Sequence, residues 1–477
     1  MKPITVSLSF SRSIMLGGLA LVCALALSNI TFAKDDISAL WNERIKSVVG
    51  VGFYVDAEQE RQQIYAFGTV IDDLGTVIFS AQSIGEQVAP AQLGGFRVYL
   101  PGATISHFYS ATYVGQDELT GWHFLRITDT NLVHELVPIT RYRAETIPRV
   151  AQEIWGIGLK KKDEDFVPYF LSSRVSIIQR LPQHVALAAQ EVTGLGLPAF
   201  DQEGAFVGLG TGGFGQTFLQ FSGLDRGGLP IVLINPDECA AILLADEVFP
   251  FLDRIPTNMN GRPKAWLGSN GLQPIDPDVA QFLGLKEQAG LVVGEVLENS
   301  PAAKAGMRER DILLSVDGQA LPILKPDRVL VTYFQREVDR RLPDDTLRLG
   351  ILRDGDRLEL KVTLTDAPEL PREAPRQYFE DLGLSVRRFT YTDGVARRLK
   401  LAQHRGVIVN FVKSNAPIST SGLMQDDWIQ EVNGAVILHY EDAVRILEAI
   451  EKDPGHDEFR VMVERGGEAK MLTIKFN

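Results

Sequence analysis

The side chains best suited to chemistry in this sequence are its histidines and one of its two cysteines, Cys239, and they are scattered along the chain. A histidine beside a serine or cysteine could act as a general base in nucleophilic catalysis. Cys239 lies in the apolar run Glu238-Cys-Ala-Ala-Ile-Leu-Leu, whose helix-like pattern favours a buried, unreactive thiol. Four histidines are expected to be surface or core residues: His107, His123, His134 and His184. No His, Cys and Asp residues are spaced closely enough for a metal site, so we expect neither a metal nor another cofactor.

The composition is that of a globular protein with several domains. The chain has 477 residues, of which 45% are hydrophobic and 23% charged. This length predicts roughly three domains. The formal net charge is −13, and we expect no nucleic-acid partner because phosphate binding needs a basic surface.

The first 33 residues have the pattern of a secretory signal. Lys2 and Arg12 precede an apolar stretch from Ile14 to Leu27, and Thr31-Phe-Ala33 resembles a signal-peptidase site. The stretch is short for a membrane span. We therefore expect export to the periplasm or cell envelope with cleavage after Ala33; an uncleaved membrane anchor is the alternative.

The region that must position any catalytic group is rich in predicted strands. The runs Val48–Val55, Ile64–Ile71 and Thr76–Phe79 are rich in β-branched and aromatic residues and are separated by Gly and Asp turns. Many short strands over roughly 200 residues favour barrels or a sandwich.

Three motifs in this region resemble the HtrA/DegP-type family of trypsin-like serine proteases. They are Phe67–Ile84, Tyr113–Ile127 and Glu191–Leu209, in the order that carries histidine, aspartate and serine in the family. The resemblance implies a mostly β fold: a trypsin-like double β-barrel. The family's catalytic histidine falls on Gln82, its aspartate on Gly121 and its serine on Leu195.

These three residues cannot perform the family's reaction. The nucleophilic hydroxyl needs a base to take its proton, and the base needs a carboxylate to fix its tautomer. Gln82 carries no proton near pH 7, Gly121 has no side chain, and Leu195 has no nucleophilic atom. We therefore expect a pseudoprotease with no catalytic residues. The alternative is an HtrA-type serine endopeptidase that uses unusual residues.

The C-terminal half contains a repeat. Gly290 and Gly406, Gly306 and Gly422, and Gly318 and Gly434 are each separated by 116 residues. Each unit is one domain long, so this is a tandem pair rather than a solenoid. The segments around these glycines resemble the PDZ domains of HtrA-type proteins, and the resemblance implies two α+β PDZ domains after the barrels.

Each repeat is preceded by a loop that resembles the carboxylate-binding loop of PDZ domains. Its backbone N–H groups hold a peptide's C-terminal carboxylate in the family, and the following strand pairs with the peptide. The expected peptide-binding residues are Trp266, Leu267, Gly268 and Ser269 in the first unit and Leu382, Gly383, Leu384 and Ser385 in the second. Helical apolar spacing predicts the opposite groove walls over Asp327–Val338 and Tyr440–Ile450.

The expected organisation has six segments: a signal peptide (1–33), a degenerate protease domain (34–252), a linker (253–263), a first PDZ domain (264–366), a linker (367–376) and a second PDZ domain (377–477). We expect an exported protein that binds C-termini or unfolded segments as a chaperone, adaptor or regulator, with active HtrA-type proteases as possible partners. A structural platform in an envelope assembly is a further alternative. Family resemblance also implies a homo-oligomer, a trimer.

Overall fold

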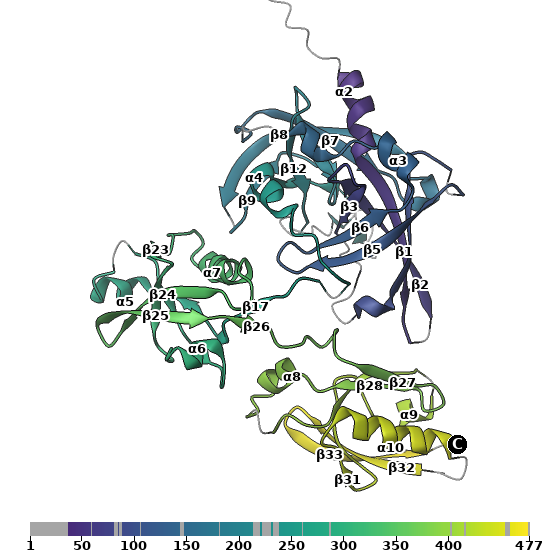
Figure 1. The fold of residues 1–477 in the computed structure, drawn as a ribbon, viewed down its shortest axis with the longest axis vertical. Coiled ribbons are helices and arrows are strands. Elements are labelled where there is room, and N and C mark those ends of the chain that lie inside the picture. The colour runs from purple at the N-terminus through teal and green to yellow at the C-terminus, as the bar shows by residue number, and fades with distance from the viewer. Residues whose placement is uncertain are drawn as a thin grey trace, which may run out of the picture.

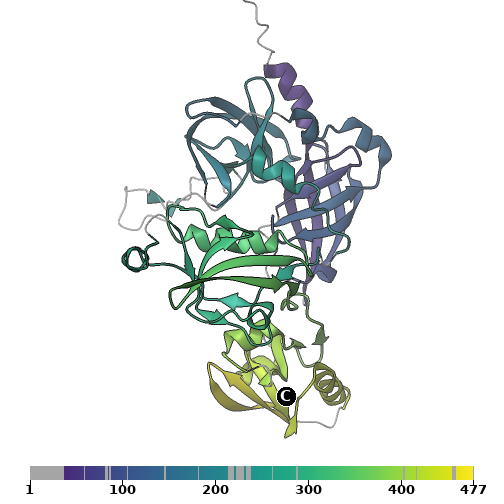
Figure 2. The same cartoon turned by 60° about the vertical axis from the view of Figure 1, so that its left-hand side comes forward.

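The computed structural model describes residues 37–475, except for several short segments. The excepted residues are 59, 81–83, 85–87, 105, 144–146, 181, 213–219, 222–229, 232–237, 260, 286–287, 401–402, 415 and 454–457. The expected signal segment, residues 1–33, therefore lies outside the described residues. Figure 1 shows two barrels at one end of the molecule and two smaller α+β units beyond them, and Figure 2 shows the same arrangement from another side.

The first barrel is closed by six antiparallel strands. They are β1 (Val48–Asp56), β2 (Arg61–Val70), β3 (Thr76–Phe79), β4 (Leu93–Tyr99), β5 (Tyr109–Asp117) and β6 (Trp122–Ile127), in the order β1-β2-β3-β6-β5-β4. Helix α2 (Ile37–Arg44) precedes the barrel, and helix α3 (Thr130–Glu135) follows it. Apolar residues of these strands point inward, and their side chains fill the interior, among them Val51, Phe53, Phe79 and Leu125.

The second barrel is also closed. Its strands are β7 (Glu153–Leu159), β8 (Pro168–Arg180), β9 (His184–Ala188), β11 (Pro198–Asp201), β12 (Phe206–Gly210) and β16 (Ala241–Leu244), in the order β11-β12-β16-β9-β8-β7. Two short pairs lie beside it: β10 (Thr193–Gly194) with β15 (Glu238–Cys239), and β13 (Gln220–Phe221) with β14 (Pro230–Ile231). The short helix α4 (Ala245–Val248) ends the barrel.

One hydrophobic cluster joins the barrels. Ile78 and Trp122 of the first barrel belong to the same buried cluster as Trp155, Leu197 and Phe200 of the second. Burial of this shared apolar surface is favourable, so it holds the two barrels together in a fixed arrangement.

The first α+β unit follows the barrels. Its strands are β17 (Ala265–Trp266), β18 (Ser269–Asn270), β19 (Gln273–Pro274), β20 (Leu291–Val292), β21 (Glu295–Val296), β22 (Ile312–Val316), β23 (Gln319–Ala320), β24 (Thr346–Arg353), β25 (Asp356–Thr363) and β26 (Thr365–Asp366). Its helices are α5 (Pro277–Phe282), α6 (Pro301–Lys304) and α7 (Val329–Asp339). The main sheet has the order β19-β20-β22-β24-β25.

The second unit has a related topology. Its strands are β27 (Arg376–Phe379), β28 (Leu384–Arg388), β29 (Val407–Val412), β30 (Trp428–Val432), β31 (Ala435–Val436), β32 (Glu458–Arg465) and β33 (Glu468–Lys475). Its helices are α8 (Tyr391–Ala396), α9 (Pro417–Thr420) and α10 (Tyr440–Lys452). The path β30-β32-β33 matches β22-β24-β25 of the first unit, and each unit has one long helix.

The expected fold, two barrels followed by PDZ-type units, is confirmed, and the predicted segment boundaries stay predictions. One local expectation is wrong. The run around Cys239 is not helical but forms β15 and β16, because β16 fills the place between β12 and β9 in the second barrel. Such a strand is buried on both faces and reads as a continuous apolar run, which periodicity alone cannot tell from a helix. The Cys239 side chain is buried, as expected.

Candidate functional site

The turn that carries Leu195 lies against the first barrel. Leu195 and Gly196 connect β10 to β11, and Gly196 has a φ of +72°. The Thr69 hydroxyl of β2 donates to the Gly196 carbonyl at 2.8 Å. A Cβ atom on Gly196 would lie 3.7 Å from the backbone nitrogen of Ser80. The structure therefore brings the position of the family's serine next to the strand that leads to Gln82, whereas Gln82 itself lies outside the described residues.

Gly121 has no side chain and supplies no carboxylate. It has a φ of +71° and its N–H donates to the Asp117 carbonyl at 2.8 Å, which closes the tight turn between β5 and β6. Glycine suits this left-handed conformation. The nearby Asp117 side chain is bound elsewhere: its carboxylate accepts from Arg254 at 3.1 Å and from the Thr120 hydroxyl at 2.9 Å.

His123 is held inside the first barrel and is not poised as a base. Its side chain is 4% exposed, its Nδ1 lies 2.9 Å from the Tyr113 hydroxyl, and its ring stacks on Phe79 with centroids 5.1 Å apart. Burial lowers the pKa of His123 to about 4. The imidazole is thus neutral near pH 7 and packed as a core residue.

This buried histidine predicts a loss of stability in acid. The unfolded chain binds the proton with a pKa near 6.5, whereas the folded chain binds it near 4. The free energy of unfolding is therefore unaffected by this histidine above about pH 6.5, and it falls by about 3 kcal/mol as the pH drops to 4. The His123→Gln variant should lack this part of the pH dependence. Hydrogen exchange of the β6 amides, measured for both proteins between pH 7 and 4, checks the prediction; parallel profiles would contradict it.

The first expected peptide-binding loop opens on a cavity. Trp266, Leu267, Gly268 and Ser269 all line a space of about 550 Å³, together with Tyr391 and Val395 of helix α8. The Trp266 and Tyr391 rings meet edge to face with centroids 5.4 Å apart. Burial, with Glu295 and Glu298 nearby, raises the pKa of Tyr391, so its phenol is neutral. The second unit therefore contributes part of the wall beside the loop of the first, which local sequence patterns do not predict.

Gly268 is packed more tightly than a carboxylate-binding role alone requires. Its φ is +79°, and a Cβ atom there would lie 2.1 Å from the Cβ atom of the buried Ser300. Its carbonyl also accepts from the Leu297 N–H at 2.9 Å. A substitution at Gly268 would therefore disturb the fold as well as the loop.

Gly268→Val should destabilise the first unit by roughly 2–4 kcal/mol, since it adds both left-handed strain and overpacking. Gly318→Val is the matched control: Gly318 has a φ of +81° but nothing within 4 Å of the added Cβ atom. Hydrogen exchange over residues 265–302 of both variants measures the difference. Equal losses in the two variants would show that the Ser300 contact contributes nothing.

The second expected loop lies in a different environment. Leu382, Leu384 and Ser385 are buried, and Gly383 has a φ of +68°. The Gly383 N–H donates to the Phe379 carbonyl at 2.9 Å. The loop thus closes a hairpin between β27 and β28 rather than facing the cavity of the first unit.

A charged junction between the modules has no local signal in the sequence. Glu118, in the β5–β6 turn, forms ion pairs with Arg372 and, at 3.6 Å, with Lys264. Arg372 also donates to the Gln116 side chain at 3.1 Å. The turn that contains Gly121 is therefore fastened to both segments that flank the first PDZ unit.

Comparison with known proteins supports this architecture. Residues 271–364 match the family model described as PDZ domain. The chain is 27% identical over 205 residues to a "Probable periplasmic serine endoprotease DegP-like" of Chlamydia pneumoniae, covering 43% of this chain and 39% of the relative. It is 29% identical over 220 residues to the protein of that name in Pseudomonas fulva, covering 44% of this chain and 43% of the relative.

A solved structure shares the fold. The HtrA-type protease AlgW, as a serine-to-alanine variant with decapeptide, superposes with a TM-score of 0.50 and 19% identity, covering 71% of this chain and all of that one. The matches to the curated relatives span about two-fifths of their length. Together these findings relate the chain to the HtrA/DegP-type serine proteases with a PDZ domain.

The relatives' names favour the serine-endopeptidase hypothesis over a protein without proteolytic activity. They do not bear on the residues found at positions 121 and 195 of this chain. In the part of the chain that the structure describes, no helix is long and apolar enough to cross a membrane.

Proposed function

We propose that the chain is an exported HtrA-like protein that binds peptides through its first PDZ unit and does not cleave them. The observation that carries this proposal is Leu195, which occupies the position where the resemblance to the family places the nucleophilic serine. The turn is in place against Thr69 and Ser80, but its side chain has no atom that can attack a carbonyl group.

The proposed peptide site is the loop Trp266, Leu267, Gly268 and Ser269. A turn of backbone amides can bind a carboxylate without a full positive charge, and the adjoining cavity of about 550 Å³ offers room for an apolar last side chain beside Trp266. Such a protein would act as a chaperone, an adaptor or a regulator of active HtrA-type proteases. The periplasmic names of the relatives support export; cleavage after Ala33 and a trimer remain part of the proposal.

A peptide with a free carboxylate and an apolar last residue should bind the full chain at least about 10-fold more tightly than its C-terminal amide, because charge-assisted hydrogen bonds contribute about 1.5–3 kcal/mol. Calorimetry with matched peptides measures this ratio, and mass spectrometry of the recovered peptide checks that it is intact. Equal affinity of the two forms, or no binding of either, would contradict the proposed site.

The second candidate function is that of an HtrA-type serine endopeptidase, which the names of the relatives favour. It requires a nucleophile other than residue 195. Ser80 is one serine next to the turn, since its Cβ atom would lie 4.0 Å from a Cβ atom built on Gly196. If the protein is an endopeptidase with Ser80 as its nucleophile, the wild-type protein should cleave unfolded casein and the Ser80→Ala variant should not. If the protein only binds peptides, neither protein should cleave it.

A further inference from the structure

The second PDZ unit differs from the first in the strand that borders its groove. In the first unit, β17 precedes the loop and pairs with β26, away from β18 and β19. In the second unit, β27 precedes the loop and pairs antiparallel with β28, from Arg376 opposite Arg387 to Phe379 opposite Leu384. The other edge of β28 pairs with β29. Strand β27 therefore covers the free edge of β28.

This edge is where a peptide would add to the sheet. Peptides that bind by strand addition pair with an exposed edge, and their side chains enter neighbouring pockets. Helix α10 contacts β27 from the other side. The chain's own residues 376–379 thus lie between a sheet edge and a helix, which is the place of a bound peptide.

Phe379 has the contacts of a peptide's last residue. Its side chain is fully buried in the cluster that includes Leu382, Leu384 and Leu447. Its carbonyl accepts from the Gly383 N–H at 2.9 Å, and the Glu380 carbonyl accepts from the same N–H at 3.2 Å. The N–H group expected to hold a foreign carboxylate is therefore already bound to the chain's own backbone.

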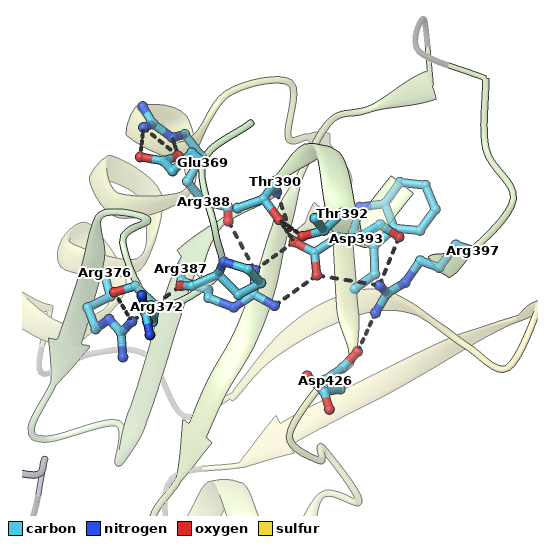
Figure 3. Close-up of polar contacts among 12 residues, drawn as sticks. Glu369, Arg372, Arg376, Arg387, Arg388, Thr390, Thr392, Asp393, Arg397 and Asp426 are labelled. Carbon is cyan, nitrogen blue, oxygen red and sulfur yellow. Dashed lines mark hydrogen bonds and ion pairs between the residues drawn. The ribbon is translucent and has the colours of Figure 1, made fainter. Parts of the chain in front are cut away.

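The strand is fastened at both ends. At its start, the Arg376 guanidinium donates to the Arg372 carbonyl at 2.9 Å, and Arg388 of β28 binds Glu369 with its closest contact at 2.7 Å (Figure 3). Beyond its end, the Asp381 N–H donates to the Glu451 carboxylate of α10 at 3.0 Å. The residues that flank the strand are therefore tied to β28 on one side, through Glu369, and to α10 on the other, through Asp381.

We propose that residues 376–379 are an internal ligand of the second PDZ unit. They close its groove to other peptides. Their sequence, Arg-Gln-Tyr-Phe, indicates which peptides the groove binds: extended strands that end in a large aromatic side chain. The internal strand competes at a high effective concentration because it belongs to the same chain. Its release would expose a second peptide site, and this inference does not depend on binding by the first unit.

The test uses the full-length protein and a fluorescent ten-residue peptide that ends in Arg-Gln-Tyr-Phe with a free carboxylate. Gln377→Pro removes the backbone N–H of an exposed residue within β27 and disfavours its pairing. Gln377→Ala keeps that N–H and is the matched control. We expect Gln377→Pro to gain one binding site for the peptide, with affinity roughly 10-fold or more above that of the wild-type protein, while Gln377→Ala behaves as the wild type.

Hydrogen exchange locates the new site. In Gln377→Pro the amides of residues 384–388 that face β27 should lose protection and regain it when the peptide is added, whereas those that face β29 keep theirs. If that variant loses the folded signals of the second unit, Arg376→Gly, which frees the strand from the Arg372 carbonyl, takes its place with the same readouts. A released strand without a gain of peptide binding at residues 384–388 would overturn the internal-ligand proposal.

Discussion

The Leu195→Ser variant should cleave unfolded casein no faster than the wild-type protein. A serine at this turn would still lack a base, and a base would still lack its orienting carboxylate, since residue 121 is glycine. His123 cannot take over, because its imidazole is buried against Phe79 and its pKa is lowered to about 4. In a well-studied serine protease, loss of the nucleophile or the base alone costs about 10⁶-fold in turnover.

The informative control is a triple variant that combines Gln82→His, Gly121→Asp and Leu195→Ser. A Cβ atom on Gly121 would meet nothing within 4 Å, so the side chain of an aspartate has room there, although the φ of +71° strains any side chain at this position. Cleavage is measured by release of fluorescent casein fragments. Turnover by the single Leu195→Ser variant, absent from a Leu195→Ala variant prepared in parallel, would show that a working base already lies beside residue 195.

Asp117→Ala should destabilise the first barrel by about 3–5 kcal/mol, the usual cost of removing one partner of a buried ion pair. The Asp117 carboxylate is 1% exposed and binds Arg254 Nη2 at 3.0 Å, and the Arg254 side chain is only 17% exposed. The variant leaves this cation without its partner and removes the acceptor of the Thr120 hydroxyl. Hydrogen exchange of the β5 and β6 amides measures the loss.

The control for this effect is the exposed ion pair of Asp56 and Arg61, whose side chains are 49% and 63% exposed. Solvent screens such surface pairs, and they contribute little to stability, so Asp56→Ala should leave the barrel nearly as stable as before. A loss for Asp117→Ala as small as that for Asp56→Ala would mean that the buried pair does not hold the β5–β6 turn.

Features encoded in short segments could be predicted from the sequence. The runs around Val48 and Thr76 form β1 and β3, and the predicted helices at Asp327–Val338 and Tyr440–Ile450 correspond to α7 and α10. Both kinds of element have a residue period that the sequence shows directly. The repeat of 116 residues likewise indicates two units of related topology.

Features that depend on distant pairing could not be predicted in this way. Arg254 meets Asp117 across 137 positions, and Tyr391 of the second unit lines the cavity of the first. The pairing of β27 with β28 is local, but nothing in the run from Arg376 to Phe379 distinguishes a strand beside the groove from one that fills it. Only the three-dimensional register makes that distinction.

The proposed function requires that no serine of this protein is activated as a nucleophile. Intact-mass spectrometry after incubation of the full-length protein with a fluorophosphonate tests it directly, because such probes label the activated serine of a serine hydrolase. Trypsin, treated in parallel, shows that the probe is competent. We predict no mass increase for this protein. A stoichiometric adduct on a serine, lost in Ser80→Ala or in another single serine variant, would contradict the claim.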